Sequence, residues 1–331
     1  MENDLLRRVG AGIPTATIRA AALRGRAPWT MLRNATLLAQ GAAQARHLLD
    51  EFGPEAVLVT GGYVSVPVGI AAWQKRIPLV VFLPDVVPGL AVRFLARLAA
   101  HVATTTPDSA RYLPQGKAVV TGYPVRPALL SLDRQQARAA LGLGPEERVL
   151  LVYGGSRGAR SINRAIGAGL ASFLEMAMVI HICGQEGDDV ELQQQAAQLP
   201  EKLRARYRLY PYLHDEMPAA LVAADITICR SGASTLGELP VAHLPAILVP
   251  YPYVHQEENA DYLVRSGTAV KVLDSQLRAE GGRPDPTALL TALRPLLEDA
   301  VQRSRMVEAT RRIARPDAAG AIVEVLRTRK K

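Results

Sequence analysis

Val149-Leu-Leu-Val-Tyr153 runs directly into Gly154-Gly-Ser-Arg-Gly-Ala159, an apolar segment joined to a glycine-rich turn. This order is typical of a buried parallel strand that turns into a helix. It returns at Ile226-Thr-Ile-Cys229, which Arg230-Ser-Gly-Ala-Ser-Thr-Leu-Gly-Glu238 follows. Each turn directs unpaired backbone N–H groups and a helix N-terminus at one spot, which suits a phosphate or diphosphate. Two such turns in one sheet predict a nucleotide held between them, with Glu238 available to bind a ribose.

Short apolar segments alternate along the chain with Ala- and Leu-rich segments of helical spacing, such as residues 37–52 and 89–103. Short buried strands that alternate with helices indicate parallel sheets built from βα units. Ligands bind to such sheets at the carboxyl ends of the strands, where the glycine-rich turns lie. The segments predicted as strands are residues 56–60, 79–83, 118–121, 149–153, 178–183, 207–210, 226–229 and 246–249.

The length of 331 residues is sufficient for two domains of ordinary size. Residues 124–147 contain three prolines and two Leu-Gly pairs, a composition typical of a connection between domains. We therefore predict an N-terminal α/β domain over residues 1–126 and a linker over residues 127–145. A C-terminal α/β domain is predicted over residues 146–331, with a helix at its end.

Composition and charge limit the class of protein and its partners. The chain is 49% hydrophobic and 21% charged, which is typical of a globular protein. Its net charge is +8, and residues 1–125 contain 13 Lys and Arg against 7 Asp and Glu. This excess predicts an anionic partner, either a membrane surface or a phosphorylated substrate. Nucleic acid is disfavoured because aromatic residues make up only 5% of the chain and the sequence contains no nucleic-acid-binding motif.

Neither a secretory signal, a membrane span nor a metal site is expected. Met1-Glu-Asn-Asp is acidic, whereas a signal peptide begins with basic residues and an apolar core. The longest uncharged run, residues 56–74, is interrupted by Gly61-Gly62 and predicts a strand, a turn and a helix. Cys183 and Cys229 lie at the ends of apolar runs and are predicted to be buried and reduced, with no metal ligands at suitable spacing.

Polar residues that follow predicted strands are candidates for binding a nucleotide sugar. Glu238 either accepts both hydroxyls of a ribose or closes a capping box with Thr235 in its own helix. Arg126 either neutralises a diphosphate or lies exposed at the surface. His255 and Gln256 either bind sugar hydroxyls or are simply solvated.

The turn over residues 154–159 lacks the G-x-G-x-x-G spacing of a dinucleotide-binding fingerprint. Its glycines either let the backbone approach a diphosphate, with Ser156 as a further donor, or only permit a tight turn. In the N-terminal region basic residues are mixed with apolar ones, which favours either docking to an anionic bilayer or a solvated amphipathic face. These residues are Arg19, Arg24, Arg26, Trp29, Met31 and Arg33.

Taken together, these segments resemble the MurG family, membrane-associated enzymes that transfer N-acetylglucosamine from UDP onto lipid I. The family has the GT-B architecture, in which two Rossmann-like domains with parallel sheets face a central cleft and a C-terminal helix crosses back. The resemblance covers most of the chain in the family's order. The matching blocks are Gly61-Gly-Tyr-Val-Ser65, Gly122-Tyr-Pro-Val-Arg126, Gly154-Gly-Ser-Arg-Gly-Ala159, Arg230-Ser-Gly-Ala233 through Glu238, and His255-Gln-Glu-Glu-Asn-Ala260.

The resemblance implies that one group of residues holds UDP and another holds the sugar. Arg126 and Ser156 would lie at the diphosphate, Glu238 at the ribose, and the backbone of His214 at the uracil. Catalysis would be an inverting displacement at the anomeric carbon by the muramoyl 4-hydroxyl, with no metal or redox cofactor. The sugar contacts and the turn around the ribose are implied for His255, Gln256, Ala233, Ser234, Thr235, Leu236 and Gly237.

The chain departs from the family in two regions. It begins at a point that the family reaches only after a first strand, a glycine-rich loop and a helix. The N-terminal domain is therefore expected to lack that unit. Asp85 stands where the family has an asparagine near the donor sugar, and it is the candidate general base. Val66 and Val68 stand where glycines are usual.

The resulting prediction is a peripheral enzyme at the cytoplasmic face of the cell membrane, with UDP-N-acetylglucosamine, lipid I and an anionic membrane surface as partners. It would convert lipid I to lipid II in peptidoglycan synthesis. Two other functions stay open, a transferase for another lipid acceptor and a non-catalytic UDP-sugar-binding protein without the N-terminal loop. A UDP-sugar 2-epimerase shares the architecture, but the block from Arg230 to Glu238 fits the transferase better.

Overall fold

The computed structural model describes residues 12–20, 28–155 and 157–328. The chain divides into two compact units. The smaller, N-terminal unit contains the described residues up to 82 together with residues 89–102 and 326–328, and the larger, C-terminal unit contains residues 83–88 and 103–325. The domain boundaries expected from composition, at residues 126 and 146, stay a prediction.

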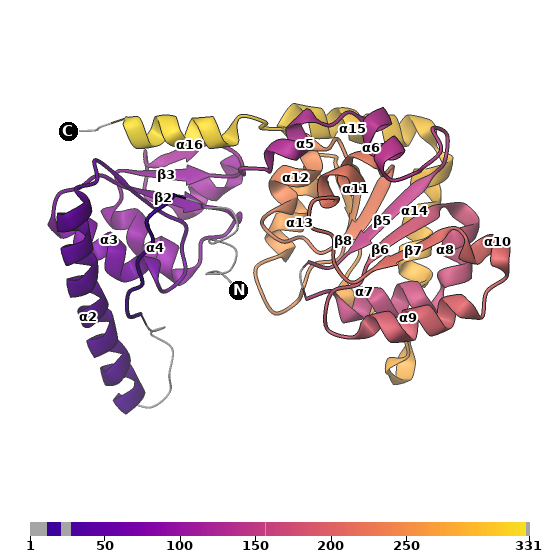
Figure 1. Cartoon of the computed structure of the whole chain (residues 1–331), viewed down its shortest axis with the longest axis horizontal. Helices are drawn as coiled ribbons and strands as arrows, with labels where there is room; N and C mark the ends of the chain where they lie inside the picture. Colours follow the sequence, from indigo (N-terminus) through magenta and orange to yellow (C-terminus); the bar gives the residue numbers. More distant parts are fainter. Residues whose placement is uncertain (1–11, 21–27, 156, 329–331) are drawn as a thin grey trace. The chain divides into compact units, whose positions relative to one another are not determined.

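The N-terminal half of the chain builds a sheet of four short strands. They are β1 (Val57–Val59), β2 (Leu79–Leu83), β3 (His101–Thr104) and β4 (Ala118–Val120), in the order β1-β2-β3-β4. Strands β2 and β3 are labelled in Figure 1. All residues of β2 and β3 are buried, which explains why β2 is a continuous apolar run. The connecting helices are α2 (Pro28–Phe52), α3 (Ser65–Gln74) and α4 (Leu90–Leu98), and α3 packs on both α2 and α4.

The C-terminal half builds a six-stranded parallel sheet. Its strands are β5 (Val149–Tyr153), β6 (Met178–Ile182), β7 (Tyr207–Tyr210), β8 (Ile226–Cys229), β9 (Ala246–Leu248) and β10 (Ala269–Lys271), in the order β10-β9-β8-β5-β6-β7. Leu150 of β5 pairs with Ile226 of β8. Because these neighbours are parallel, the two glycine-rich turns that follow them lie at the same edge of the sheet, as predicted.

Side chains alternate between the faces of this sheet, and each face carries one hydrophobic core. The remaining elements are η1 (Pro107–Tyr112), α5 (Pro127–Ser131), α6 (Arg134–Ala140), α7 (Arg160–Ala168), α8 (Leu170–Met176), α9 (Asp188–Ala197), α10 (Glu201–Arg204), α11 (Met217–Ala223), α12 (Thr235–Val241), α13 (Glu257–Arg265), η2 (Asp274–Leu277), η3 (Glu280–Gly282), α14 (Thr287–Glu298), α15 (Ala300–Ile313) and α16 (Ala318–Arg327). Val149 and Leu151 pack in a core with α6, α11, α12 and α13, whereas Leu150 and Val152 pack in a core with α7, α8 and α14.

Each segment predicted as a strand contains one, but the helix expected over residues 89–103 is wrong at its C-terminal end. There α4 ends at Leu98, Ala99 adopts an extended backbone, and β3 begins two residues later. The four residues of β3 are all buried and too few to show the alternation of apolar and polar residues that marks a strand. In the sequence, the helical spacing of α4 therefore continues into β3. β10 is not predicted because it contains only three residues, one of them a lysine.

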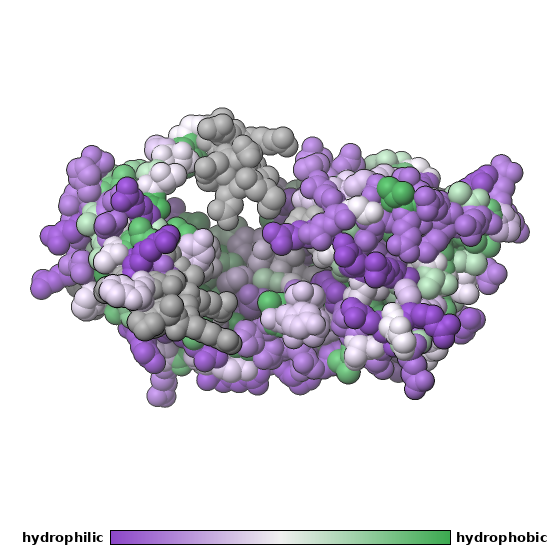
Figure 2. Space-filling view, turned by 90° about the horizontal axis from the view of Figure 1, so that it is seen from below, coloured by the Kyte–Doolittle hydropathy of each residue, from purple (hydrophilic) through white to green (hydrophobic). Residues whose placement is uncertain are grey.

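The uncharged run of residues 56–74 forms β1, a turn and α3, as predicted. Within the described parts of the chain, no helix combines the length and the apolar character needed to cross a membrane. On the face shown in Figure 2, hydrophobic residues occupy small areas of a mostly hydrophilic surface.

Both cysteines are buried, as predicted, with exposed fractions of 1% for Cys183 and 0% for Cys229. Cys183 follows β6 directly, and Cys229 is the last residue of β8. Burial raises the pKa of the Cys183 thiol to about 11 and that of the Cys229 thiol to about 12. Both thiols are therefore protonated at neutral pH.

Candidate functional site

Arg126, His214 and Glu238 are far apart in the sequence but come together in the C-terminal unit. Arg126 immediately precedes α5 in an extended conformation. Its Nη1 donates a hydrogen bond of 2.9 Å to the carbonyl oxygen of His214, and its Nη2 lies 3.9 Å from Oε1 of Glu238. The side chain of Glu238 is 16% exposed and that of Arg126 is 48% exposed. A largely buried carboxylate thus faces a half-exposed cation.

The charge of Glu238 depends on opposing effects. The pKa of its carboxyl is raised, because burial outweighs the lowering effects of Arg126 and of a hydrogen bond with the Ser234 side chain. The capping box considered for Thr235 and Glu238 is not formed, because Thr235 Oγ1 donates to the carbonyl oxygen of Gly232 at 2.6 Å. The carboxylate is therefore held by a cation and a hydroxyl, in a form suited to accept hydrogen bonds.

A glycine is required at position 237 because α12 packs tightly on the segment that leads to Arg126. A Cβ at this position would lie 2.6 Å from Cβ of Tyr123 and 2.9 Å from its carbonyl oxygen. Burial raises the pKa of the Tyr123 hydroxyl, and the charges of Glu238 and Asp85 raise it further. Tyr123 therefore lies within electrostatic reach of both carboxylates.

A second cluster surrounds Asp85, the candidate base. Asn259 of α13 is fully buried, and its Nδ2 donates to Oδ1 of Asp85 at 2.8 Å and to the carbonyl oxygen of Ser231 at 3.0 Å. Burial raises the pKa of Asp85, whereas the Asn259 amide and the nearby His255 lower it. Asn259 belongs to a matching block of the sequence, but no pattern there distinguishes it as the partner of Asp85.

Gln256 and His255 lie beside this cluster, just before α13. The side-chain Oε1 of Gln256 accepts a hydrogen bond from the backbone N–H of Tyr251 at 3.0 Å. The backbone carbonyl oxygen of Gln256 accepts one from the Ser231 hydroxyl at 2.7 Å. His255 is exposed, with Nδ1 at 3.6 Å from Oε1 of Glu258. The loop thus fixes Gln256, while His255 lies near Glu258 and Asp85 and faces solvent.

The turn that follows β5 packs against the end of β6. Gly158 has a φ of 83°, and a Cβ at this position would collide with the carbonyl oxygen of Cys183. Gly155 has a φ of 88°, but a Cβ there would meet no described atom within 4 Å. Packing thus accounts for Gly158, and the backbone at Gly155 is open to approach. Ser156 lies outside the described residues.

The predicted turn around the ribose is partly buried. Thr235 and Leu236 are 2% and 5% exposed, and Gly237 is buried against Tyr123. Ala233 and Ser234 are more accessible. Any contact that Thr235 or Leu236 makes with a nucleotide therefore has to come mainly from the backbone.

Sequence reasoning missed an ion pair that holds the second glycine-rich turn. Arg230 Nη1 donates to Oδ1 of Asp274 at 2.6 Å, and its Nη2 donates to the Ser161 hydroxyl at 2.8 Å. Ser161 in turn donates to the same Asp274 oxygen at 2.6 Å. Ser161 lies in α7, so this pair connects the turn after β8 with the helix that follows the turn after β5. A charged residue at the end of an apolar strand is the only signal of it in the sequence.

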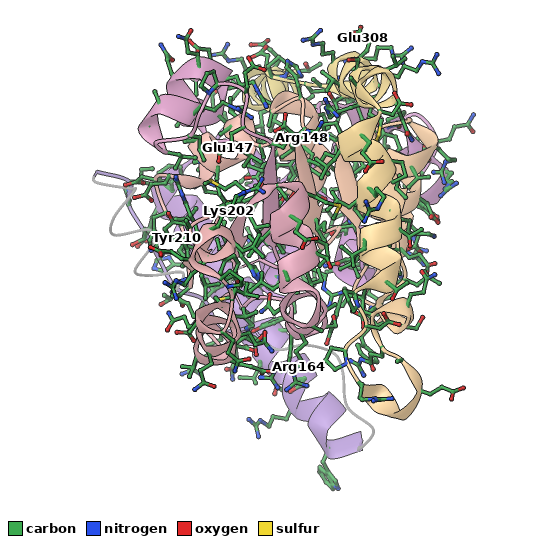
Figure 3. The ribbon with its side chains drawn as sticks, turned by 90° about the vertical axis from the view of Figure 1, so that its right-hand side faces the viewer. Glu147, Arg148, Arg164, Lys202, Tyr210 and Glu308 are labelled. Carbon is green, nitrogen blue, oxygen red and sulfur yellow. The ribbon has the colours of Figure 1, made fainter. Side chains whose placement is uncertain are left out.

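A cavity of about 800 Å³ lies at the opposite edge of the sheet. Its lining includes Asp225, which immediately precedes β8, and Glu308 of α15. Figure 3 labels residues near both edges of the sheet. Glu308 and Arg148, the residue before β5, lie toward the top of the view. Tyr210, the last residue of β7, lies lower. None of the predicted site residues that the structure describes lines this cavity.

Sequence comparison finds the glycosyltransferase family 28 N-terminal domain over residues 3–104 and the C-terminal domain of the same family over residues 149–320. A relative from Roseiflexus sp. (strain RS-1) is 48% identical, over 99% of this chain and 81% of its own length. That relative is named UDP-N-acetylglucosamine--N-acetylmuramyl-(pentapeptide) pyrophosphoryl-undecaprenol N-acetylglucosamine transferase.

Among solved structures, MurG of Acinetobacter baumannii matches with a TM-score of 0.76 and 26% identity, over 99% of this chain and 88% of that chain. A UDP-GlcNAc 2-epimerase from Neisseria meningitidis has a TM-score of 0.65 at 16% identity, over 89% of this chain and 82% of that chain. The epimerase likeness shows only that the GT-B fold is shared. The identity to transferases along nearly the whole chain decides between the two, and the chain belongs to the MurG family of glycosyltransferases.

Proposed function

We infer that this protein transfers N-acetylglucosamine from UDP-N-acetylglucosamine to the 4-hydroxyl of undecaprenyl-diphospho-muramoylpentapeptide, which converts lipid I to lipid II. The observation that carries this function is the 48% identity over 99% of the chain to a relative named for that reaction. Further relatives with the same name are 33–39% identical to the chain. The protein is accordingly an enzyme that uses a UDP-sugar donor and takes part in cell-wall synthesis.

The cluster of Arg126, His214 and Glu238 is the proposed binding site for UDP. Glu238 accepts the two ribose hydroxyls, because it is largely buried and an adjacent cation favours its ionised form. Arg126 meets the diphosphate together with Ser156, and the backbone of His214 meets the uracil. The backbone of residues 233–237 surrounds the ribose, since only Ala233 and Ser234 of these residues have accessible side chains.

The second cluster is the proposed site of the sugar and of proton transfer. His255 and Gln256 contact the N-acetylglucosamine, and Asp85 acts as the general base. The acceptor 4-oxygen forms a bond to the anomeric carbon while the bond from that carbon to the UDP oxygen breaks. Asp85 takes the proton of the acceptor hydroxyl, and Arg126 stabilises the negative charge of the departing UDP.

Calorimetry with UDP and UDP-N-acetylglucosamine tests the donor site. Glu238→Gln removes the charge that binds the ribose, so we expect the Kd for both ligands to rise by about 10-fold or more, the value of one or two charged hydrogen bonds. Glu298→Gln is the matched control, because Glu298 is an exposed carboxylate on α14 of the same unit. Equal affinities for the two variants would contradict the assignment of Glu238.

Transfer of labelled N-acetylglucosamine to a lipid I analogue tests the reaction. We expect turnover with the muramoyl acceptor and none when its 4-hydroxyl is blocked, since that oxygen is the nucleophile. Turnover only with a different lipid acceptor would contradict the lipid I assignment. Tight UDP binding without turnover on any acceptor would instead indicate a UDP-sugar-binding protein.

We also propose that the N-terminal unit docks on an anionic membrane at the cytoplasmic face. Its helices expose large apolar side chains next to basic ones, a combination that binds anionic lipid surfaces. Leu90 and Phe94 of α4 are 72% and 41% exposed, and Arg93 and Arg97 of the same helix are exposed as well. Further exposed apolar side chains are Trp29 and Phe52 on α2 and Trp73 on α3.

The N-terminal residues expected to face a bilayer are only partly described. Arg24 and Arg26 lie outside the described residues, as does the side chain of Met31. Arg19 donates to Oε1 of Gln40 on α2 at 3.0 Å. Arg33 of α2 is exposed, so a basic contribution from this helix to membrane docking is proposed for Arg33.

Flotation with phosphatidylglycerol vesicles tests the membrane proposal. We expect Phe94→Asp combined with Leu90→Asp to lower the bound fraction several-fold, because two apolar anchors are replaced by charges that anionic lipids repel. Val190→Asp in the C-terminal unit is the control, since Val190 is also an exposed apolar residue. Binding that is equal for the double variant, the control and the natural chain would rule out docking through α4.

A further inference from the structure

Asn259 is a buried, hydrogen-bonded residue that has no role in the mechanism proposed above. Its side chain is 0% exposed. Nδ2 donates to Oδ1 of Asp85 at 2.8 Å and to the carbonyl oxygen of Ser231 at 3.0 Å, and Oδ1 accepts from the backbone N–H of Val86 at 2.9 Å. A carboxamide has two N–H donors, and both have a partner here.

These partners fix the orientation of the carboxamide. If the amide were turned over, its oxygen would face the Asp85 carboxylate and the Ser231 carbonyl oxygen, and its N–H groups would face the N–H of Val86. All contacts would then become repulsive, and buried polar groups without partners are costly. The Asn259 N–H group is therefore held pointing at one oxygen of Asp85.

We propose that Asn259 is a positioning residue for Asp85, which holds Oδ1 of the carboxylate and leaves Oδ2 to take the proton of the acceptor hydroxyl. This proposal rests on the proposed function, in which Asp85 is the general base. The Asn259 amide bonds to Oδ1 of Asp85 and not to Oδ2. An N–H donor also favours the ionised form of a carboxylate, the form in which a base accepts a proton.

Asn259 also connects Asp85 with the loop that contains Gln256, through Ser231. The Ser231 carbonyl oxygen accepts from Asn259, and the Ser231 hydroxyl donates to the carbonyl oxygen of Gln256 at 2.7 Å. The positions of Asp85 and Gln256 therefore depend on the same residue of the turn after β8. Proton transfer needs the base within hydrogen-bond reach of the acceptor hydroxyl, so a small displacement of Asp85 lowers the rate strongly.

The test is the pH dependence of kcat for transfer to a lipid I analogue. Asn259→Ala removes the N–H that favours the ionised carboxylate, so the pKa of Asp85 rises. We expect the acidic limb of the profile to move up by about one pH unit and kcat at pH 8 to fall by about 10-fold or more. The KM for UDP-N-acetylglucosamine should change by less than about 3-fold, because the ribose and diphosphate contacts are intact.

The other titratable groups that bear on Asp85 among the described residues are His255 and Tyr123, and both remain in this variant. A shift of the limb therefore reports the amide. Thr268→Val is the matched control, because Thr268 is also buried, follows α13, and donates to the carbonyl oxygen of Leu263 at 2.9 Å. It removes a buried hydrogen bond at the other end of α13 and should leave the acidic limb in place.

Asn259→Asp tests the same proposal if the alanine variant does not fold. It has the same shape and still accepts from the Val86 N–H, but it places a second carboxylate beside Asp85. Two adjacent carboxylates cannot both ionise easily, so the acidic limb should move further up than in Asn259→Ala. An acidic limb that stays at the natural pH in both variants would overturn the positioning role.

Asp85→Asn separates this proposal from the proposed base. It should lower kcat by about 100-fold or more while UDP binding is retained. Full transfer by Asp85→Asn means that Asp85 is not the base, and the role of Asn259 falls with it. If Asp85→Asn is inactive, adding Asn259→Ala should lower kcat no further, because the amide acts through Asp85. A further 10-fold loss in the double variant would show that Asn259 acts independently.

Discussion

Arg230 is a single side chain that connects the turn after β8 with α7 and η2. It pairs with Asp274 at 2.6 Å, and the two side chains are only 11% and 12% exposed. Arg230→Met leaves the Asp274 carboxylate buried without its cation. We expect the free energy of unfolding of the C-terminal unit to fall by about 3 kcal/mol, the usual effect of breaking a buried pair. Urea denaturation, monitored by far-UV circular dichroism, measures this loss of stability.

Arg265→Met is the control for this prediction. Arg265 also pairs with an aspartate, Asp108, at 2.6 Å, but its side chain is 53% exposed. An exposed pair contributes about 1 kcal/mol or less. If both variants lose the same stability, burial does not set the strength of the Arg230 pair.

At the residue scale, the sequence indicates best those groups whose position follows from a nearby strand, and the role of Glu238 stays a prediction. Glu238 is identified because it follows an apolar strand and a glycine-rich turn. Asn259 and Asp85 are 174 residues apart in the sequence, and their hydrogen bond depends on how distant segments pack. Arg230 and Asp274, 44 residues apart, are missed for the same reason.

At the scale of elements, the contact between the turn after β5 and the end of β6 depends on Gly158. This glycine combines a φ of 83° with a Cβ position that the Cys183 carbonyl group occupies. We expect Gly158→Ala to lower the free energy of unfolding by more than about 2 kcal/mol, because strain in the left-handed region and a backbone clash add together. Chemical denaturation measures the loss.

Gly155→Ala isolates the first of these two effects. Gly155 has nearly the same φ, 88°, but open space around its Cβ position. The alanine there should lose only about 1–2 kcal/mol, the strain of a left-handed residue. A loss at Gly155 as large as that at Gly158 would mean that the clash with Cys183 is relieved by a small shift.

An apolar run that is bounded by turn residues predicts a strand, as in β5 and β8. β3 was missed because it follows α4 after only two residues and no glycine or proline marks the change. Its strand conformation comes from pairing with neighbours in the sheet, which is a property of the tertiary structure. The sequence therefore predicts the type of sheet better than the number of its strands.

At the scale of the whole C-terminal unit, buried His181 makes stability depend on pH. It is 0% exposed, and burial lowers its pKa to about 3. The unfolded chain takes up a proton near pH 6.5, but the folded unit does not until about pH 3. The stability from this group is complete above pH 6.5 and declines as the pH falls toward 3, by at most about 1.4 kcal/mol per pH unit.

Denaturation at pH 7.5, 6 and 5 tests this dependence. His181→Gln should be less stable at pH 7.5, since His181 bonds to Asn163 at 3.0 Å and Tyr207 at 2.9 Å, but its stability should vary less with pH. His255→Gln replaces an exposed histidine and should keep the natural slope. The account of His181 would be wrong if its variant had the slope of the natural chain.

The two protected thiols make this protein suitable for site-directed fluorophores. Maleimide dyes react with thiolates, and buried groups with pKa values of about 11 and about 12 supply almost none at neutral pH. Cysteines introduced at exposed Phe52 and Val190, one in each unit, would therefore take up dye while Cys183 and Cys229 stay unmodified. Energy transfer between such a pair, with and without UDP, would report whether the nucleotide changes the separation of the units in solution.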